Sequence, residues 1–369
     1  MNATQTELLT QQQHKMMNLL KLIYLLLLLT LNLSCLEKKS TQEKTPEPEL
    51  GTTLTQDSLK FTSPIRSIFQ DSKGNYWFGS KEGVAVYNGA SFTYFSTNEG
   101  LRDNQVLSIQ EDEDGVIWLE TQHGVSSYDG ITIHEQTSEI TETSNADWMK
   151  SDNDLWFGAG NKEGVYRYDG KTLNFLAFPK PKVINPNTKY GVTGISKGIN
   201  NMIWFGTYAG VFGYNGKEFT IINDETLGFD TEVAPLHVRS ILEDSKGRLW
   251  IGNNGIGVLL KEGDSISNFS EKQNLIHPNS WRKGDTSMPG TLEHVFVIFE
   301  DGKGAIWFGD RDAGIWRYDG VKMTNFSKKD GLTTDFAVSI FEDSKGVLWF
   351  GMADGTIYKW NENAFERQF

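Results

Sequence analysis

Three histidines are the first candidates for chemistry in this chain of 369 residues, because an imidazole titrates near neutral pH and can act as a general base. His123, His277 and His294 lie in segments that we predict to be loops. A base beside a carboxylate or a divalent metal supports elimination, so a lyase is one hypothesis. The three histidines follow no metal-ligand spacing, and a loop histidine is usually polar surface. We therefore predict a protein that is not an enzyme, with no catalytic residue, metal or cofactor.

A second set of residues suits ligand binding. Trp281, Arg282 and Lys283 are consecutive, and an exposed indole beside two cations can stack on a sugar or hold an acidic group. The alternative is that Trp281 anchors its own loop. The predicted ligand-binding residues all lie in or beside loops: Trp281, Arg282, Lys283, His277, His294, His123, Tyr208, Arg311 and Tyr190. Taken singly, those in loops between second and third strands, such as His123, Tyr208 and Arg311, are better explained as solvated loop residues.

Cys35 is the single cysteine, so the chain forms no internal disulfide and no thiolate zinc site. It follows an apolar run, Leu22 to Leu31, that two lysines precede, which is the layout of a secretory signal peptide. The stretch from Leu31 to Cys35 resembles the lipobox of bacterial lipoproteins, although Asn32 stands where those proteins usually have leucine. The resemblance implies lipidation of Cys35.

The lipobox divides the N-terminal region into two parts. Residues 1–34 form the predicted signal peptide. Residues 35–60 are rich in Lys, Glu, Thr and Pro without a hydrophobic period, which predicts a disordered tether. We therefore expect a lipid-anchored protein of the bacterial cell envelope, at the outer membrane. A plain cleaved signal and an uncleaved anchor are the alternatives.

The composition favours many short strands. Aromatic residues make up 12% of the chain, and 37 glycines stand beside 9 prolines, which suits strands joined by tight turns. The formal net charge is -13. Binding of phosphate requires clustered Lys and Arg, so we expect no nucleic-acid partner.

An internal repeat positions the candidate residues. Its clearest copy, Ile65 to Phe95, has four runs of β-branched and aromatic residues separated by turn residues. One tryptophan marks the same place in each of seven copies: Trp77, Trp118, Trp156, Trp204, Trp250, Trp307 and Trp349. Four-stranded repeats of roughly 40 to 45 residues predict propeller blades. We therefore predict an all-β fold, a seven-bladed β-propeller of four-stranded antiparallel blades over residues 61–369, with these tryptophans packed between sheets.

Turn residues recur at two places in each copy. Asp71-Ser72-Lys73-Gly74 and its counterparts join the first and second strands, where Asp bonds the turn backbone. Asp112-Glu113-Asp114-Gly115 also suggests a calcium loop, but other copies have Lys at the third position, so we favour a turn. Blades three and four lack parts of this motif. For the loop between the third and fourth strands we predict type I′ turns, with positive φ at both central residues: Asn88-Gly89, Asp129-Gly130, Asp169-Gly170, Asn215-Gly216 and Asp319-Gly320.

The unit from Val338 to Gly351, with Gly331-Leu332 ahead of it, resembles the two-component regulator propeller repeat. Glu99-Gly100-Leu101 is the same leader before blade two. In that family the propellers form the periplasmic sensor part of bacterial regulators and are associated with polysaccharide breakdown products. Ala364 to Phe369 supplies blade seven with its own fourth strand and ends the sequence. The sequence departs from the family in having no kinase region after this strand, so we expect a free-standing propeller, and closure of the ring by strand exchange is not required.

The loops between the second and third strands lie on the same face as the loops between blades. These loops differ in every copy, and variable loops on a rigid scaffold are the usual place for binding. We expect a ligand-binding, sensor-type propeller that recognises a glycan fragment or an envelope protein partner. The alternatives are a lyase acting on a polysaccharide or small molecule, and a scaffold for protein assembly.

Overall fold

The computed structural model describes residues 15–18, 20–21, 52–54, 58–140, 148–179, 190–199, 201–229, 235–278 and 286–369. The chain divides into two units, Met1–Pro48 and Glu49–Phe369. In the first unit, the described residues 15–18 and 20–21 are helical. No helix within the described ranges is both long and apolar enough to span a bilayer. Cys35 and the segment from Trp281 to Lys283 lie outside the described residues.

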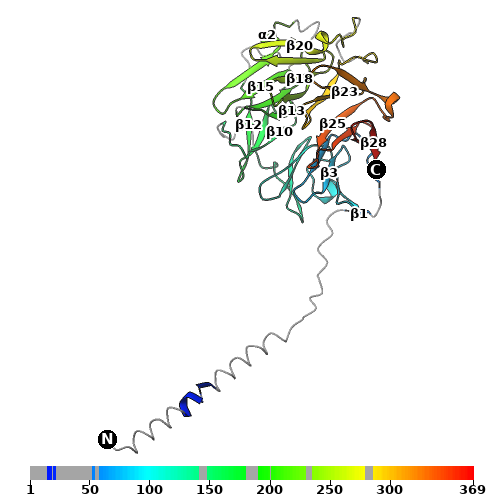
Figure 1. The fold of residues 1–369 in the computed structure, drawn as a ribbon. Helices are drawn as coiled ribbons and strands as arrows, with labels where there is room; N and C mark the ends of the chain where they lie inside the picture. The colour runs from blue at the N-terminus through cyan, green and yellow to red at the C-terminus, as the bar shows by residue number, and fades with distance from the viewer. Residues whose placement is uncertain are drawn as a thin grey trace, which may run out of the picture. The chain divides into compact units, whose positions relative to one another are not determined.

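The second unit is a seven-bladed β-propeller, as the repeat predicted (Figure 1). The first strands of neighbouring blades contact one another, so they surround the centre, and the later strands of each blade follow outward. The strands of blades one to three are β2 (Ser67–Gln70), β3 (Tyr76–Gly79), β4 (Val84–Tyr87) and β5 (Phe92–Phe95); β6 (Val106–Glu111), β7 (Ile117–Thr121), β8 (Gly124–Tyr128) and β9 (Ile133–Glu135); and β10 (Leu155–Gly158), β11 (Gly164–Tyr168) and β12 (Leu173–Ala177).

The remaining four blades each have four antiparallel strands. They are β13 (Val192–Lys197), β14 (Ile203–Thr207), β15 (Gly210–Tyr214) and β16 (Phe219–Asn223); β17 (Val238–Glu243), β18 (Leu249–Asn253), β19 (Val258–Glu262) and β20 (Ser265–Asn268); β21 (Val295–Glu300), β22 (Ile306–Asp310), β23 (Ile315–Tyr318) and β24 (Met323–Phe326); and β25 (Ala337–Glu342), β26 (Leu348–Met352), β27 (Ile357–Trp360) and β28 (Phe365–Gln368).

Short helices follow the outer strands of four blades. Each begins after a Ser or Asn whose side chain accepts a backbone N–H, which is the usual way to satisfy a helix N-terminus. These helices turn the chain from the outer edge of one blade toward the centre of the next. They are η1 (Thr97–Glu99), α2 (Asp224–Leu227), α3 (Phe269–Lys272) and η2 (Lys328–Asp330).

The repeated aspartate has a double role in five blades. One carboxylate oxygen accepts backbone N–H groups of its own turn, as Asp343 does from Lys345 and Val347 at 2.9 and 3.0 Å. The other oxygen accepts the indole N–H of the blade's tryptophan at 2.7–2.9 Å, which joins the turn to the core. The pairs are Asp71 with Trp77, Asp112 with Trp118, Asp244 with Trp250, Asp301 with Trp307, and Asp343 with Trp349.

Blades three and four, which lack the full motif, replace the aspartate differently. Trp204 donates its indole N–H to Glu243 of blade five. In blade three, Asp154 instead forms a buried ion pair with Arg167, whose Nε lies 2.6 Å from the carboxylate. The guanidinium of Arg167 also lies over the ring of Trp156. All seven repeat tryptophans are buried, whichever partner they have.

The loops between the third and fourth strands are not the predicted type I′ turns. Asn88 does not have positive φ, and neither do its counterparts in the other blades. Four residues connect Tyr87 to Phe92, and the side-chain oxygen of Asn88 accepts the N–H groups of Ala90 and Ser91 at 2.9 Å. The longer loop removes the need for two left-handed residues, because the Asn or Asp side chain closes it.

Residues near the start of the second unit close the ring between blades seven and one. Phe61 is buried in a cluster with Phe78 of blade one and Ile357 of blade seven. The backbone of β1 (Thr52–Leu54) pairs antiparallel with β5 and adds a fifth strand to blade one. The predicted disordered tether over residues 35–60 therefore ends earlier than composition indicated, because the free edge of β5 offers backbone groups for pairing.

Candidate functional site

One residue in the inner strand of most blades is turned out of the regular ladder. In blades two, four, five, six and seven, the pairing between the first and second strands shifts register at the same repeat position. Such bulges re-aim a side chain. The bulged residues are Leu107, Thr193, Arg239, Phe296 and Val338. Arg66 holds the equivalent place in blade one, directly before β2.

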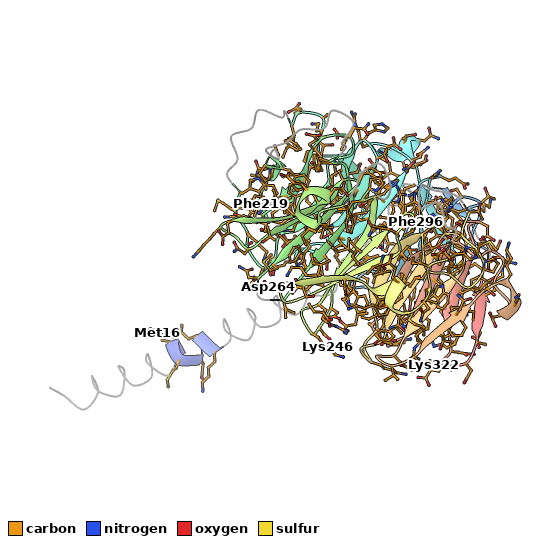
Figure 2. All side chains as sticks on the ribbon, turned by 90° about the horizontal axis from the view of Figure 1, so that it is seen from above. Met16, Phe219, Lys246, Asp264, Phe296 and Lys322 are labelled. Carbon is orange, nitrogen blue, oxygen red and sulfur yellow. The ribbon has the colours of Figure 1, made fainter. Side chains whose placement is uncertain are left out.

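The bulged residues and Arg66 all line one cavity of about 1000 Å³ at the centre of the propeller. Lys81 and Tyr208, from loops between second and third strands, also line it, as does Tyr190 from the segment before β13. Figure 2 shows Phe296 toward the middle of the propeller, with Lys322 at its periphery. The cavity is therefore bounded by inner strands as well as by loops.

Two arginines give this cavity its chemical character. Arg66 and Arg239 have no carboxylate partner among the described residues. The Nε of Arg66 is buried and finds no hydrogen-bond partner there. Burial lowers the pKa of Arg66, and the nearby charge of Arg239 lowers that pKa further. The two guanidinium groups are thus close enough to repel one another in a desolvated place.

Aromatic residues hold Arg239 in position. Its guanidinium lies 4.3 Å from the ring centre of Phe296 and 5.4 Å from that of Tyr208. These cation–π contacts hold the guanidinium while leaving its charge without a carboxylate partner among the described residues. Tyr208 itself is 37% exposed, so part of its surface faces open space.

The cavity extends to blade three, which has three strands within the described part of the chain. Polar side chains of blade two satisfy the inner edge of β10. Gln110 donates to the carbonyl of Trp156 at 2.8 Å, and the N–H of Gly158 donates to Glu120. A Cβ on Gly158 would lie 2.6 Å from Glu120 Oε1, so a larger residue there would displace this carboxylate. These side chains thus lie against the described inner edge of β10 and form a polar recess.

Glu120 is the most perturbed carboxylate on the cavity wall. It is 7% exposed, and Ser108 donates a hydrogen bond to it at 2.6 Å. Burial raises the pKa of Glu120 to about 7, against the hydrogen bonds from Ser108 and Gly158. Near neutral pH the group is therefore partly protonated. Two carboxylates and four basic side chains line the cavity: Glu120, Glu163, Arg66, Lys81, Lys197 and Arg239.

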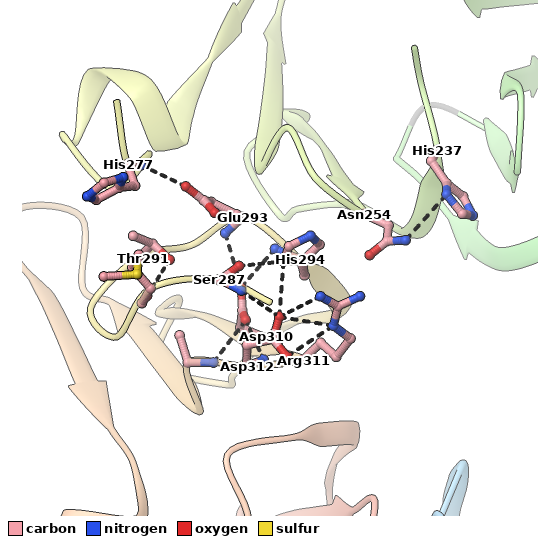
Figure 3. A network of polar contacts seen from close by, with 12 residues as sticks. His237, Asn254, His277, Ser287, Thr291, Glu293, His294, Asp310, Arg311 and Asp312 are labelled. Carbon is pink, nitrogen blue, oxygen red and sulfur yellow. Dashed lines mark hydrogen bonds and ion pairs between the residues drawn. The ribbon is translucent and has the colours of Figure 1, made fainter. Parts of the chain in front are cut away.

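The predicted residues His294 and Arg311 belong to a different place, a buried polar network between blades five and six (Figure 3). His294 is 1% exposed, bonds Ser287 and lies 3.2 Å from the Asp312 carboxylate. Arg311 lies 2.7 Å from the same carboxylate. These contacts join the loop before β21 to the loop after β22. The network is a structural connection and does not line the cavity.

Asp310 anchors this network. Its carboxylate accepts the backbone N–H groups of Glu293, His294, Asp312 and Ala313 at 2.8–3.1 Å. Burial raises the pKa of Asp310 to about 7, whereas these hydrogen bonds favour its ionised form. The group therefore fixes the backbone of two loops rather than facing a ligand.

The other predicted residues are dispersed. His123 is exposed and bonds Asp103, and the backbone N–H of His277 donates to Glu293 at 2.7 Å. Of the candidates, Tyr208 and Tyr190 line the cavity. Trp281, Arg282 and Lys283 lie outside the described residues. The three histidines do not converge, and no group of three His, Cys, Asp or Glu within the described ranges is arranged to hold a metal.

Arg66 and Arg239 were not among the predicted residues. A signal for them exists in the repeat, where the inner strands read Ile65-Arg66-Ser67-Ile68 and Val238-Arg239-Ser240-Ile241. The second position of this pattern varies between blades while its neighbours are repeated. Variation inside a repeated core motif marks a position that packing does not determine.

The fold and the cavity together define a β-propeller with a polar central cavity. Four segments of the chain match the two component regulator propeller repeat, at residues 59–82, 100–120, 233–255 and 331–354. These segments fall in blades one, two, five and seven. The chain thus carries two component regulator propeller repeats, as the sequence pattern predicted. No curated protein sequence matches the chain.

Solved structures of several proteins share the fold. The extracellular domain of a hybrid two component system from B. thetaiotaomicron is similar over 85% of this chain, with 20% identity and a TM-score of 0.62. The chain spans 41% of the length of that protein. Virginiamycin B lyase from Staphylococcus aureus is similar over 84% of this chain and 97% of its own, with 17% identity and a TM-score of 0.58. YCF48 from Cyanidioschyzon merolae is similar over 84% of this chain and 99% of its own, with 12% identity and a TM-score of 0.55.

Proposed function

We propose that this chain is a sensor-type propeller that binds a small ligand in its central cavity without transforming it. The main observation is the contrast between positions of the repeat. The aspartate and tryptophan positions serve packing, whereas the bulged position carries a different side chain in most blades and lines the cavity. A site that is built from the variable position of a repeated motif is suited to recognition of one particular ligand.

The comparisons support the sensor interpretation at the level of fold and repeat. The chain shares its repeats with two component regulator propellers and its fold with the extracellular domain of such a system. We therefore propose an extracytoplasmic location for the propeller. We further propose that Cys35 is lipidated and anchors the protein to the cell envelope. Incorporation of a labelled fatty acid that is lost in Cys35→Ala would support the anchor, and equal labelling of both proteins would contradict it.

A glycan fragment suits the cavity better than a protein partner does. The cavity is bounded by residues of all seven blades and lined by hydrogen-bonding groups and by aromatic rings, which are the usual contacts of sugars. A protein partner would instead need a large open face on the propeller, because standard protein–protein interfaces are broad surfaces. The alternative of a lyase finds less support, because no histidine lines the cavity in the described part of the chain.

Occlusion of the cavity tests this proposal. A panel of oligosaccharides would first be screened by thermal shift, and each hit measured by isothermal titration calorimetry. Leu107→Trp fills the cavity from a bulge, and we expect it to weaken binding at least tenfold. Val321→Trp is the matched control, since Val321 is 90% exposed on a distant hairpin loop. Equal affinity of both variants would contradict the proposed site.

Recovery of the ligand tests the absence of catalysis. After long incubation with the protein, mass spectrometry should return the oligosaccharide unchanged. A product with a new double bond would instead support the lyase alternative, because elimination forms one.

A further inference from the structure

Three other arginines that are buried or half-buried in the described part of the propeller have acidic partners. This is expected, because a desolvated charge is costly unless it is paired. The pairs are Arg167 with Asp154 at 2.6 Å, Arg248 with Asp244 at 2.7 Å, and Arg311 with Asp312 at 2.7 Å. Arg66 and Arg239 depart from this pattern, since neither has a carboxylate partner among the described residues.

The surroundings of these two arginines increase the free-energy cost of keeping their charges away from water. Arg66 has a buried Nε without a hydrogen-bond partner, and Arg239 is pressed between the rings of Phe296 and Tyr208. Both side chains line the same cavity, and the charge of Arg239 adds to the positive potential at Arg66. An anion that enters the cavity would relieve this repulsion and receive charge-assisted hydrogen bonds from both groups.

We propose that the ligand is an acidic saccharide, and that Arg66 and Arg239 together bind its carboxylate or sulfate group. This proposal rests on the proposed binding function and specifies the class of ligand. Guanidinium groups suit such anions because their N–H groups match two oxygens at once. The hydroxyl groups of the sugar would meet the polar wall, which includes Gln122 and Asn161.

The charge distribution favours selective entry of a small anion. The chain has a formal net charge of -13, yet four of the six charged residues that line the cavity are basic. A cleft of one sign with low-dielectric walls focuses the potential inside it. Large polyanions would be repelled by the outer surface, whereas a short acidic oligosaccharide fits within the cavity and interacts with its local field.

A matched pair of ligands tests the proposal directly. Oligogalacturonate and its methyl ester have the same sugar rings and differ in charge. We expect the acid to bind at least tenfold more tightly than the ester in calorimetry, and raised salt to weaken the acid selectively. Chondroitin sulfate disaccharide provides the sulfate arm, and loss of binding with the same disaccharide without its sulfate would assign the anion as sulfate. Failure of the charged probes in both arms to bind would overturn the proposal.

Substitutions assign the effect to the two arginines. Arg66→Gln and Arg239→Gln should each weaken binding of the acidic probe about tenfold or more and leave binding of the ester unchanged. Arg367→Gln is the matched control, because Arg367 is exposed on the outer strand β28. Equal affinity of acid and ester, with both lost in Leu107→Trp, would overturn the anion proposal and leave the binding function intact. Unchanged binding in Leu107→Trp would instead overturn the cavity as the site.

Stability without ligand provides an independent readout. If Arg66 is retained for binding, then Arg66→Gln removes an unpaired buried charge, and its melting temperature should equal or exceed that of the parent protein. A clear fall in melting temperature would mean that Arg66 serves the fold, and would contradict the proposal.

Discussion

At the scale of single residues, the aspartate and tryptophan of each repeat act as one unit. Asp343 accepts hydrogen bonds from two turn N–H groups, from the indole of Trp349 at 2.9 Å and from the hydroxyl of Tyr76 at 2.8 Å. Tyr76 belongs to blade one, so this carboxylate also joins two blades across the seam. A motif that reads as a turn in the sequence therefore contributes to the closure of the ring.

Replacement of this aspartate should lower stability in a pH-dependent way. Burial alone would raise the pKa of Asp343, but hydrogen bonds from Trp349, Tyr76 and the turn hold that pKa below its ordinary value. A depressed pKa stabilises the fold above the ordinary value for Asp, and this contribution is lost as pH falls through the folded-state pKa. We expect Asp343→Asn to lower the free energy of unfolding by about 2 kcal/mol at pH 7.

Urea unfolding at pH 7 and at about pH 3 would measure this difference. The gap between parent and variant should shrink at the lower pH, because the carboxylate of the parent becomes protonated. Asp264→Asn is the control, since Asp264 is exposed on a hairpin loop. A loss that is the same at both pH values would contradict the role of the ionised carboxylate.

The pH dependence of the contribution of Glu120 to stability should have the opposite sign to that of Asp343. Burial raises the pKa of Glu120 to about 7, so its ionised form is disfavoured in the folded protein. Between the ordinary pKa of a glutamate and pH 7 the unfolded chain loses this proton more readily, and the folded state becomes relatively less stable as pH rises. Glu120→Gln should therefore stabilise the protein by about 2 kcal/mol at pH 8 and have little effect at pH 4. Thermal unfolding of the parent protein and of the variant across this pH range would measure the difference in stability. A difference that does not grow as the pH rises would contradict this account.

At the scale of elements, the bulges of the inner strands determine which side chains line the central cavity. Five inner strands bulge at the same repeat position, so the propeller presents five independently variable side chains to one cavity. Arg66 provides a sixth, from the segment that also closes the ring. The same short region from Phe61 to Arg66 thus serves both the seam and the cavity.

The seam should be sensitive to loss of its apolar residue. Phe61 is 8% exposed and packs among residues of blades one and seven. We expect Phe61→Ala to lower the free energy of unfolding by about 3 kcal/mol, because a buried aromatic ring is lost and a cavity remains. Chemical denaturation would measure this, with Val321→Ala as an exposed control. A change no larger than that of the control would mean that the ring closes without this segment.

The sequence predicted the elements better than it predicted the site, for a physical reason. Trp77 and its counterparts are fixed by local packing, so their spacing revealed the blades. The direction of Arg239 depends on a register shift between two strands, and no local propensity encodes this shift. The inner strands have the sequence pattern of core, so the sequence favoured loop residues such as His294, which is buried in a structural network.

At the scale of the whole molecule, an acidic protein encloses a cavity whose charged lining is mostly basic. The repeated residues maintain the ring, and the varied residues meet at its centre. Under the proposed function, this division would let one repeat family serve different ligands, because the bulged positions can change without loss of the Asp and Trp contacts. The proposal locates binding near the propeller axis rather than on the longest loops.

Hydrogen–deuterium exchange with and without saturating oligogalacturonate tests this central claim most directly. A ligand in the cavity should slow exchange in the inner strands β6, β13 and β17, and should leave the hairpin loops between third and fourth strands unchanged. Protection confined to residues 277–294, with unchanged exchange in the inner strands, would contradict a binding site at the centre of the propeller.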